Sequence, residues 1–429
     1  MESRPKSTIE TVRGTLARRN RAERRFRNFG RAAVLLGLAF LVLMFVNIFV
    51  TGYSAFWQTY VKLPVHFDPQ VIDPQRTGDR DTLGAADYGA LVKTSVRSLF
   101  PEVRRRRDRR NLAMLVSRGT VFELRRMTLE DPSLVGTRAE IWAPVDDDYD
   151  MLHKGNVDRA LPEADRRLSD QQIAWFDRLV ADGRVESRFN ATLFKAGDSR
   201  EPELAGIWGA AMGSFFTLVV TLLLSFPLGV ATAVYLEEFA PRNRLTSLIE
   251  VNINNLAAVP SIVFGLLGLA VFINFFGLPR SAPLVGGLVL TLMTLPTIII
   301  AGRASLQSVP PSIREAALGV GASKMQMIVH HVLPLAMPGM LTGTIIGMAR
   351  ALGETAPLLM IGMVAFVVDV PQGVTDAATA LPVQIFLWLD SPERAFAERA
   401  SAAIMVLLAF LIGMNALAIV LRRRFERRW

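Results

Sequence analysis

Long apolar runs, each separated by a shorter polar stretch, fill the second half of the chain. Each run is close to the roughly 20 residues that a helix needs to cross a bilayer. One further run stands alone near the beginning, ahead of a long polar region. The pattern predicts six transmembrane helices, at 32–52, Ile207–Leu236, Leu256–Phe276, Leu284–Ala301, Met337–Val368 and Ala402–Leu421.

Residues 1–31 are rich in arginine and poor in apolar side chains. They predict a basic, partly disordered segment on the cytoplasmic side, because Lys and Arg accumulate in cytoplasmic loops. A cleaved signal peptide is the competing interpretation of the run that follows. The basic segment and the run are both longer than is typical of a signal peptide, and no Ala-x-Ala site follows, which favours an uncleaved anchor over 32–52.

The polar region, residues 53–204, has mixed charge and no spanning run, and it is long enough to bury a core. Alternating apolar positions predict strands at Val61–Phe67 and Val121–Leu124, whereas Ser169–Ala181 has the period of a helix. We therefore predict an α+β extracytoplasmic domain inserted between transmembrane helices 1 and 2.

Two charged clusters lie in this region. The basic run Arg104–Arg110 and the acidic residues Asp146, Asp147, Asp148 and Asp150 are expected to be solvated surface. An anion trap or a docking patch is the alternative.

Composition agrees with a membrane protein. The chain has 429 residues, of which 51% are hydrophobic, and its mean hydropathy is +0.31. The net charge is +9, but arginines gather at the ends of apolar runs, where they orient a membrane protein, so nucleic acid is not an expected partner. The absence of cysteine excludes disulfides, thiol catalysis and Cys-based metal sites.

The polar stretch 310–334 separates the fourth and fifth runs and has the pattern of two short helices. Capping-box spacings occur twice, and each predicts a helix start. Glycines that can take positive φ separate the two helices, and a proline ends the second. The residues concerned are Ser312 with Glu315, Ser323 with Gln326, Gly319 and Gly321, and Pro334.

This stretch resembles the EAA loop of ABC-importer permease subunits, which docks into a cleft on an ATPase subunit. The pattern is EAA, three residues, Gly, nine residues, Ile, any residue, Leu-Pro. His331 stands in the Ile position, which weakens the match slightly. The residues to which the resemblance assigns ATPase coupling are Glu315, Ala316, Ala317, Gly321, Leu333 and Pro334.

Arg350 and Glu354 are four residues apart in the fifth predicted span. Charged residues at membrane depth are costly enough to need a partner or an aqueous path. The guanidinium of Arg350 suits an oxyanion, so we predict a substrate pathway at Arg350, Glu354 and Thr355, with a structural ion pair as the alternative.

Three further strings narrow the resemblance to the PstA family, the permease subunits of bacterial phosphate ABC importers. They are Arg350–Leu359 (RALGETAPLL), Asn255–Gly265 and Leu381–Ile385, and the similarity covers about residue 205 to the end. Residues 205–429 are therefore expected to form the permease domain, with an all-α type I importer fold.

The resemblance also implies partners and a location. The partners are a second permease subunit in a heterodimer, a dimer of ATP-binding subunits and an extracytoplasmic phosphate-binding protein. No GxxxxGK[ST] phosphate loop occurs, so ATP and Mg²⁺ would be used by the partner subunit, and this chain would be neither an enzyme nor the holder of a cofactor. It would be a multi-pass protein of the bacterial inner membrane with both termini cytoplasmic.

Three rival functions stay open. A permease for sulfate or molybdate would share the EAA loop, and an ion-coupled secondary transporter would need no ATPase. A membrane-bound enzyme or sensor is motivated by the large polar region, although no Ser/His/Asp or metal spacing supports catalysis there.

Overall fold

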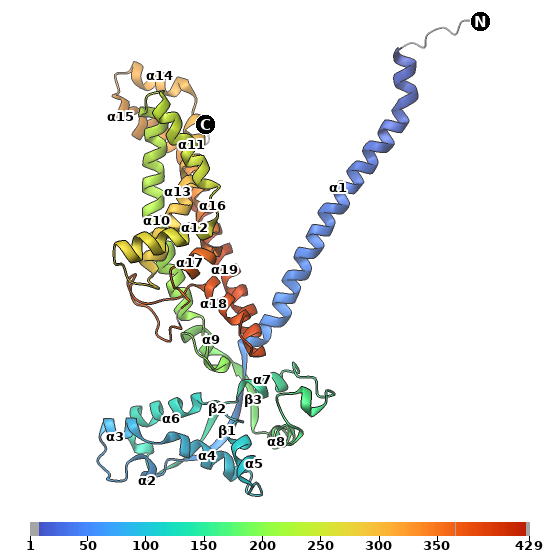
Figure 1. Cartoon of the computed structure of the whole chain (residues 1–429), viewed down its shortest axis with the longest axis vertical. Coiled ribbons are helices and arrows are strands. Elements are labelled where there is room, and N and C mark those ends of the chain that lie inside the picture. The colour runs from blue at the N-terminus through green and yellow to red at the C-terminus, as the bar shows by residue number, and fades with distance from the viewer. Residues whose placement is uncertain (1–7, 365, 426–429) are drawn as a thin grey trace, which may run out of the picture. The chain divides into compact units, whose positions relative to one another are not determined.

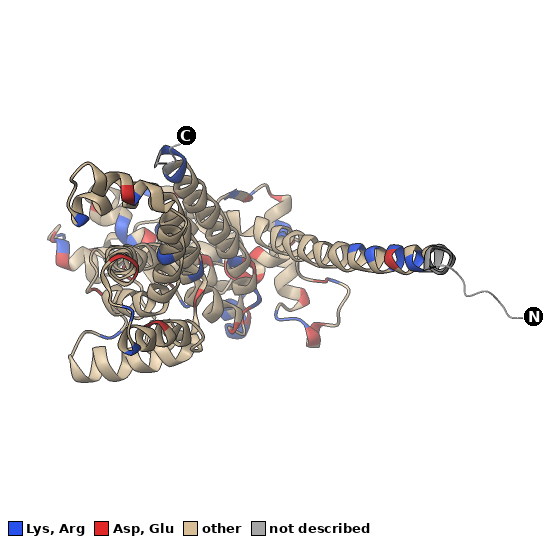
Figure 2. Cartoon of the chain, turned by 90° about the horizontal axis from the view of Figure 1, so that it is seen from above, with Lys and Arg blue, Asp and Glu red and all other residues tan. Residues whose placement is uncertain are grey.

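The computed structural model describes residues 8–364 and 366–425, and the chain divides into two units, Met1–Thr51 and Gly52–Trp429. The long helix α1 (Thr8–Tyr53) forms the described part of the first unit. Figure 2 shows basic residues, coloured blue, gathered along its first half. The prediction of disorder is therefore wrong for residues 8–31, where Ala, Arg, Glu and Leu favour a helix; residues 1–7 lie outside the described residues.

A three-stranded antiparallel sheet organises residues 54–204, which we call the sheet segment (Figure 1). Its central strand β1 (Trp57–His66) pairs with β2 (Arg138–Pro144) on one side and β3 (Val185–Phe189) on the other. The strand predicted from Val61 is confirmed. Because side chains alternate along a strand, Val61, Leu63 and Val65 all point into one buried core.

Helices cover this core. They are α2 (Pro69–Ile72), α3 (Arg80–Ala85), α4 (Tyr88–Leu99), α5 (Arg106–Ala113), α6 (Gly119–Glu130), α7 (Asp147–His153) and α8 (Asp170–Ala181). Helix α9 (Ala191–Lys195) instead contributes Leu193 to a separate cluster that also includes residues C-terminal to the sheet segment. Short 3₁₀ turns complete the segment, at η1 (Ser54–Phe56), η2 (Pro132–Leu134), η3 (Glu163–Asp165) and η4 (Pro202–Leu204). The predicted helix at Ser169–Ala181 is confirmed as α8, and Ser169 forms a capping box with Gln172.

The strand predicted at Val121–Leu124 is wrong, since these residues belong to α6. The buried residues of α6 include Thr120, Leu124 and Thr128, whereas Phe122 is exposed. Their spacing of four is helical, and four alternating residues were too short a window to distinguish the two periods.

Residues 205–425 form the helical segment. Its elements are α10 (Trp208–Val234), η5 (Tyr235–Phe239), α11 (Arg244–Ala257), α12 (Ser261–Leu267), η6 (Gly268–Phe275), α13 (Pro283–Gln307), α14 (Pro311–Gly319), α15 (Lys324–Met327), η7 (Ile328–Val332), α16 (Leu333–Gly353), α17 (Ala356–Met360), α18 (Leu381–Leu389) and α19 (Arg394–Phe425). The elements η5, η6 and η7 are π-helical and continue the α-helices before them.

Within the described residues, five helices are long and apolar enough to span a membrane, and a sixth span exists if one bent pair is counted. That pair, Arg244–Ala257 with Ser261–Phe275, bends by 105°. The predicted single helix at Leu256–Phe276 is therefore broken, because α11 ends at Ala257 and Pro260 is the N-cap of α12 instead of lying inside a helix. The predicted span Met337–Val368 is also wrong at its end, because α16 stops at Gly353.

Glycines set the closest packing in the helical segment. Gly339, Gly343 and Gly347 recur every fourth residue on α16 and lie against Ser305, Ala301 and Thr294 of α13, respectively. Small residues at this spacing let two helices approach closely, and the resulting van der Waals packing favours helix association in a bilayer.

Candidate functional site: the EAA-like loop and the end of α16

The EAA-like loop has an exposed side and a set of buried apolar residues that anchor it, Ala317, Met327, Ile328 and Val332. Glu315 and Ala316 are exposed on α14, whereas Ala317 is buried. Gly321 follows the helix with a φ of +89°, a left-handed conformation that L side chains rarely adopt. The structure therefore leaves Glu315 accessible and requires glycine at the turn.

The predicted start of the first helix in this loop is wrong. The first helix begins at Pro311 with Pro310 as its N-cap, so the Ser312–Glu315 capping box does not form, because a proline at the first helical turn already supplies the start. The second capping box, Ser323 with Gln326, is confirmed.

Pro334 does not end the second helix. Helical structure runs without interruption from Lys324 to Gly353, 30 residues. Pro334 lies in the first turn of α16, directly after the π turn η7 (Ile328–Val332). The wider π turn changes the hydrogen-bond pattern at the point where the proline ring would obstruct a regular α-helix. Leu333 and Pro334 are thus part of a long helix.

The loop also presents apolar side chains. Leu318 is 50% exposed, Val320 86%, Met325 58% and Val329 45%. They lie in α14, in the turn after it and in the helix that follows, on both sides of Gly321. Together with Glu315 they form a mixed apolar and acidic surface of the kind that protein partners cover.

An ion network that the sequence analysis missed holds this loop in place. The guanidinium of Arg314 lies 2.8 Å from Glu238 of η5 and donates to the backbone oxygens of Val309 and Leu306 at 2.7 and 2.8 Å. Arg303 of α13 similarly lies 2.8 Å from Glu250 of α11. The only sequence signal was a set of charged residues at the ends of apolar runs, which does not identify the partners.

Arg314→Gln is expected to lower stability and uptake. The change removes the partner of Glu238, whose side chain is only 8% exposed, and a buried unpaired carboxylate costs several kcal/mol at full burial, so we expect about 2 kcal/mol here. Thermal unfolding of the purified chain measures this loss. Arg242→Gln, at an exposed arginine, is the control, and the double variant with Glu238→Gln should recover part of the loss; equal unfolding temperatures for Arg314→Gln and Arg242→Gln would contradict this role.

The predicted pathway residues lie at the other end of the same helix. Arg350 is in the last turn of α16, and its Nε lies 3.3 Å from Oε1 of Glu354, which caps the helix. The two side chains are 51% and 19% exposed. Thr355 follows as the N-cap of α17. The structure brings these three residues together, and within the described residues no bond is found to the two terminal nitrogens of Arg350, which can serve a further partner.

Two of the sequence strings noted above meet at this point. A side chain at Gly265 of α12 would lie 2.7 Å from Cα of Pro357 and 2.9 Å from Cβ of Met360, so the backbones of α12 and α17 touch there. The string that contains Pro260 and Gly265 thus supports the helix that follows Arg350 and Glu354.

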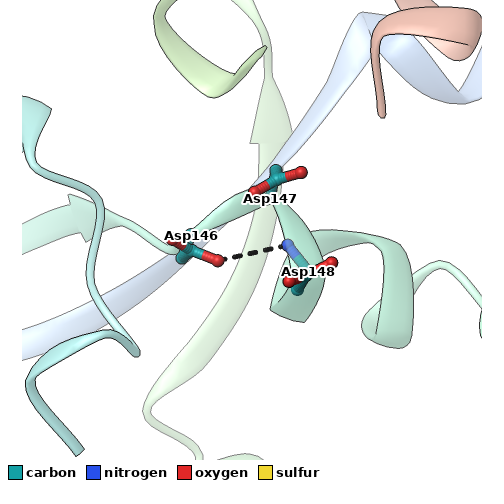
Figure 3. Close-up of side chains that lie close together, drawn as sticks. All are labelled: Asp146, Asp147 and Asp148. Carbon is teal, nitrogen blue, oxygen red and sulfur yellow. Dashed lines mark hydrogen bonds between the residues drawn. The ribbon is translucent and has the colours of Figure 1, made fainter. Parts of the chain in front are cut away.

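The charged clusters of the sheet segment behave differently from one another. Arg104–Arg110 is largely exposed, as predicted. The acidic cluster is not free surface, because Asp150 is buried and Asp146, Asp147 and Asp148 are half-buried, with carboxylate oxygens within 4.8 Å of one another (Figure 3). Burial and neighbouring carboxylates raise the pKa of Asp146 to about 8 and that of Asp147 to about 7.

Two family models match parts of the chain. The family model "Binding-protein-dependent transport system inner membrane component" matches residues 225–429, and "Domain of unknown function (DUF3333)" matches residues 13–163. Among solved structures, an inward-facing form of the MetNI methionine ABC transporter is 17% identical and covers 52% of this chain and 98% of its own, with a TM-score of 0.42.

Curated relatives are more informative. "Phosphate transport system permease protein PstA 1" of Mycobacterium tuberculosis is 34% identical over 223 residues, 52% of this chain and 72% of the relative. PstA of Mycobacterium leprae is 34% identical over 226 residues, 52% and 72% of the two chains, and PstA of Haemophilus influenzae is 28% identical over 223 residues, 52% and 78%. The chain is a polytopic helical membrane permease and belongs to the PstA family of phosphate transport system permease proteins.

Proposed function

We propose that this chain is one of the two membrane subunits of an ATP-driven phosphate importer. Its partners would be a second permease subunit, a dimer of ATP-hydrolysing subunits that use ATP and Mg²⁺, and a phosphate-binding protein outside the membrane. The observation that carries the proposal is the helix Lys324–Gly353, which joins the EAA-like loop to Arg350. The relatives named as phosphate permeases support the choice of substrate.

This helix is suited to transmit force. Thirty helical residues extend about 45 Å, the thickness of a bilayer with its headgroups. An ATPase subunit that holds Glu315, Ala316 and the exposed Val320 would move the helix from its cytoplasmic end. The displacement would reach Arg350 and the α12–α17 contact, and so alternate access to the pathway.

The proposed orientation follows from charge. Both termini would be cytoplasmic, at the inner membrane of a bacterium, since basic residues favour that side. The EAA-like loop, Arg242, Arg244 and Arg422–Arg424 then share the cytoplasmic face, and the sheet segment lies outside as an extracytoplasmic domain between the first two spans.

Arg350, Glu354 and Thr355 would form part of the anion pathway. A guanidinium offers several N–H donors to a phosphate, and the bond to Glu354 orients it without using them all. Glu354 would also limit how tightly an anion is held, because a carboxylate beside the bound phosphate repels it. A weak site is what passage through a membrane requires.

The function is tested by uptake and by assembly. Membranes that contain this chain and its partner subunits should accumulate labelled phosphate in the presence of excess sulfate or molybdate, and mild-detergent purification of the chain should recover an ATP-binding subunit. Competition by sulfate or molybdate would favour a permease for that oxyanion. Uptake driven by an ion gradient without an ATPase would favour a secondary transporter.

Arg350→Gln is expected to reduce phosphate uptake by about tenfold, the equivalent of one lost charge-assisted contact of roughly 1.4 kcal/mol. Arg350→Lys keeps the charge without the planar fork and should retain part of the uptake. Assembly with the partner subunits should be unchanged in both variants. Loss of assembly instead would assign Arg350 and Glu354 to a structural ion pair.

A further inference from the structure

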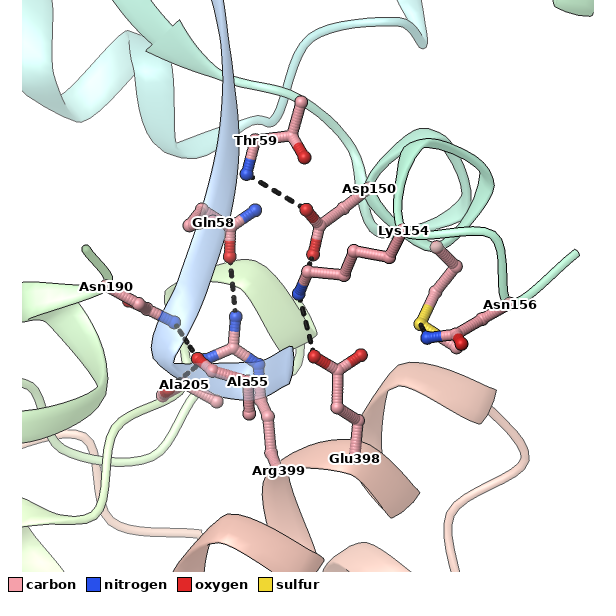
Figure 4. Close-up of polar contacts among 11 residues, drawn as sticks. Ala55, Gln58, Thr59, Asp150, Lys154, Asn156, Asn190, Ala205, Glu398 and Arg399 are labelled. Carbon is pink, nitrogen blue, oxygen red and sulfur yellow. Dashed lines mark hydrogen bonds and ion pairs between the residues drawn. The ribbon is translucent and has the colours of Figure 1, made fainter. Parts of the chain in front are cut away.

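Buried polar side chains join the sheet segment to the beginning of α19 (Figure 4). Arg399 is 4% exposed and donates to Oε1 of Gln58 at 2.9 Å and to the backbone oxygen of Ala205 at 2.8 Å. Gln58 lies on β1, so a cation of α19 is bonded to the central strand of the sheet.

Lys154 makes a second bridge across the same junction. Its Nζ lies 2.7 Å from Oδ2 of Asp150 and 2.7 Å from Oε1 of Glu398. The other oxygen of Asp150 accepts a bond from the backbone N–H of Thr59 at 2.9 Å. All three charged side chains are at most 10% exposed. Separating the sheet segment from α19 would leave these groups to be resolvated.

The junction contains more negative than positive groups. A cavity of about 10 Å³ is lined by four carboxylates and by two cations, so the lining would carry a net charge of −2 if every group were ionised. Two uncompensated charges in a buried cavity are costly. The carboxylates are those of Asp147, Asp150, Glu203 and Glu398, and the cations are Lys154 and Arg399.

Lys154 and Arg399 together balance the charges of Asp150 and Glu398, so the excess of two negative charges rests on Asp147 and Glu203. Glu203 is 3% exposed; its Oε1 accepts a hydrogen bond from Ser117, and its Oε2 has no partner within the described residues. A metal ion fits this arrangement poorly. The cavity holds about one water, and Lys154 already occupies the position between Asp150 and Glu398.

We infer that this junction is a proton-dependent latch, in which Asp147 and Glu203 each hold a proton while the sheet segment is docked on α19 and release it when the two separate. The inference goes beyond the proposed transport function and does not depend on which anion is carried. It makes the docking of the sheet segment on α19 dependent on the pH of the surrounding solution.

The pKa values of Asp147 and Glu203 are both shifted in the direction that the latch requires. Burial, then Asp148 and Glu203, raise the pKa of Asp147 to about 7, and burial raises the pKa of Glu203. A carboxyl group whose pKa is raised in the docked state binds its proton more tightly there. Docking is therefore favoured at low pH and weakens as pH rises from the ordinary carboxyl range to about 7, the pKa of Asp147 in the docked state, by up to about tenfold per pH unit for each proton held.

The charged groups that face Asp147 and Glu203 come from four elements. They are Asp146, Asp148, Asp150 and Lys154 at α7, Glu201 beside η4, Arg167 before α8, and Glu393, Arg394, Glu398 and Arg399 at the start of α19. Acidic groups outnumber basic ones. The basic groups therefore cannot neutralise every carboxylate once Asp147 and Glu203 have lost their protons.

The test is a distance measurement on the full chain in lipid nanodiscs. The chain has no cysteine, so spin labels can be attached at two introduced cysteines, Lys93→Cys on α4 and Asp390→Cys beyond α18, both exposed. Pulsed electron resonance should give one narrow distance distribution at about pH 6. At about pH 9 a second, longer population should appear, with the ratio of docked to undocked chains reduced at least tenfold.

Asp147→Asn with Glu203→Gln removes the excess charge, so this variant should keep the narrow distribution at both pH values. Asp177→Asn is the matched control, because Asp177 is an exposed carboxylate of the same segment paired with Arg159, and it should respond as the wild type does. If the double variant does not fold, the single variant Glu203→Gln and the pH titration of the wild type still test the latch.

Three results would overturn the latch. The wild type could have the same distribution at both pH values, or the charge-removed variant could open as far as the wild type does. Added calcium or magnesium could restore the narrow distribution of the wild type at the higher pH, which would make the cluster a metal site. Each result would leave phosphate uptake, and with it the proposed function, unaffected.

Discussion

Glu315→Lys should abolish phosphate uptake while the chain still inserts and folds. Glu315 is exposed on α14 and makes no ion pair within the described residues, so reversing its charge should cost the isolated chain little. In the assembled importer it would meet the ATPase subunit, where an unpaired interfacial charge costs about 2–5 kcal/mol. Gly321→Val should have a similar effect through strain of about 1–3 kcal/mol, because its φ is +89°.

Matched controls lie on the same loop. Ser312→Lys places a new cation one turn away on an exposed position of α14, and Gly319→Ala changes a glycine without a positive φ and with nothing near its Cβ position. Both should transport nearly as well as the wild type. The measurements are phosphate uptake and the amount of ATP-binding subunit that co-purifies; normal values of both for Glu315→Lys would remove the loop from the coupling mechanism.

Gly343→Leu should destabilise the helical segment more than any surface change. A side chain at Gly343 would overlap Ala301 of α13, and overpacking costs typically about 1–3 kcal/mol, or more where two helix backbones must separate. We expect about 3 kcal/mol, a clearly lower unfolding temperature in detergent and a matching loss of assembled complex. The α13–α16 contact supports the helix that carries the EAA-like loop, so uptake should fall with it.

Gly413→Leu is the control for this substitution. Gly413 lies in α19, and nothing is found within 4 Å of its Cβ position. Leucine has a higher helix propensity than glycine, so this variant should unfold at the same temperature as the wild type or slightly higher. Equal losses in the two variants would mean that leucine perturbs membrane insertion, and the tight α13–α16 contact would then not explain the result for Gly343.

Local pattern alone predicted most of the helical segment. The apolar runs that became α10, α13 and α19 are long enough to span a bilayer, and a chain in lipid has few ways to satisfy its backbone other than a helix. The Ser323 capping box was also predictable, because its hydrogen bonds join residues that are only three apart in the sequence. The spacing of Glu315, Gly321 and Leu333-Pro334 was visible in the residue order itself.

Prolines were interpreted less well, because their effect depends on the neighbouring turns. Pro260 separates α11 from α12, whereas Pro334 is carried through a continuous helix by the π turn before it. Propensity treats both as helix breakers. Which one breaks the helix is decided by how the flanking helices pack.

The sequence by itself determined most of the segments that are apolar enough to span a membrane, the position of the polar loop and the spacing of Arg350 and Glu354, because these depend on residues near one another in the chain. Only the tertiary structure decided that the acidic cluster is partly buried and not solvated. Asp150 and Lys154 are buried by Glu398 and Arg399, more than 240 residues later, and Arg314 is held by Glu238, 76 residues earlier. A solvated charge and a buried one have the same local sequence, since burial depends on which distant segment packs against it.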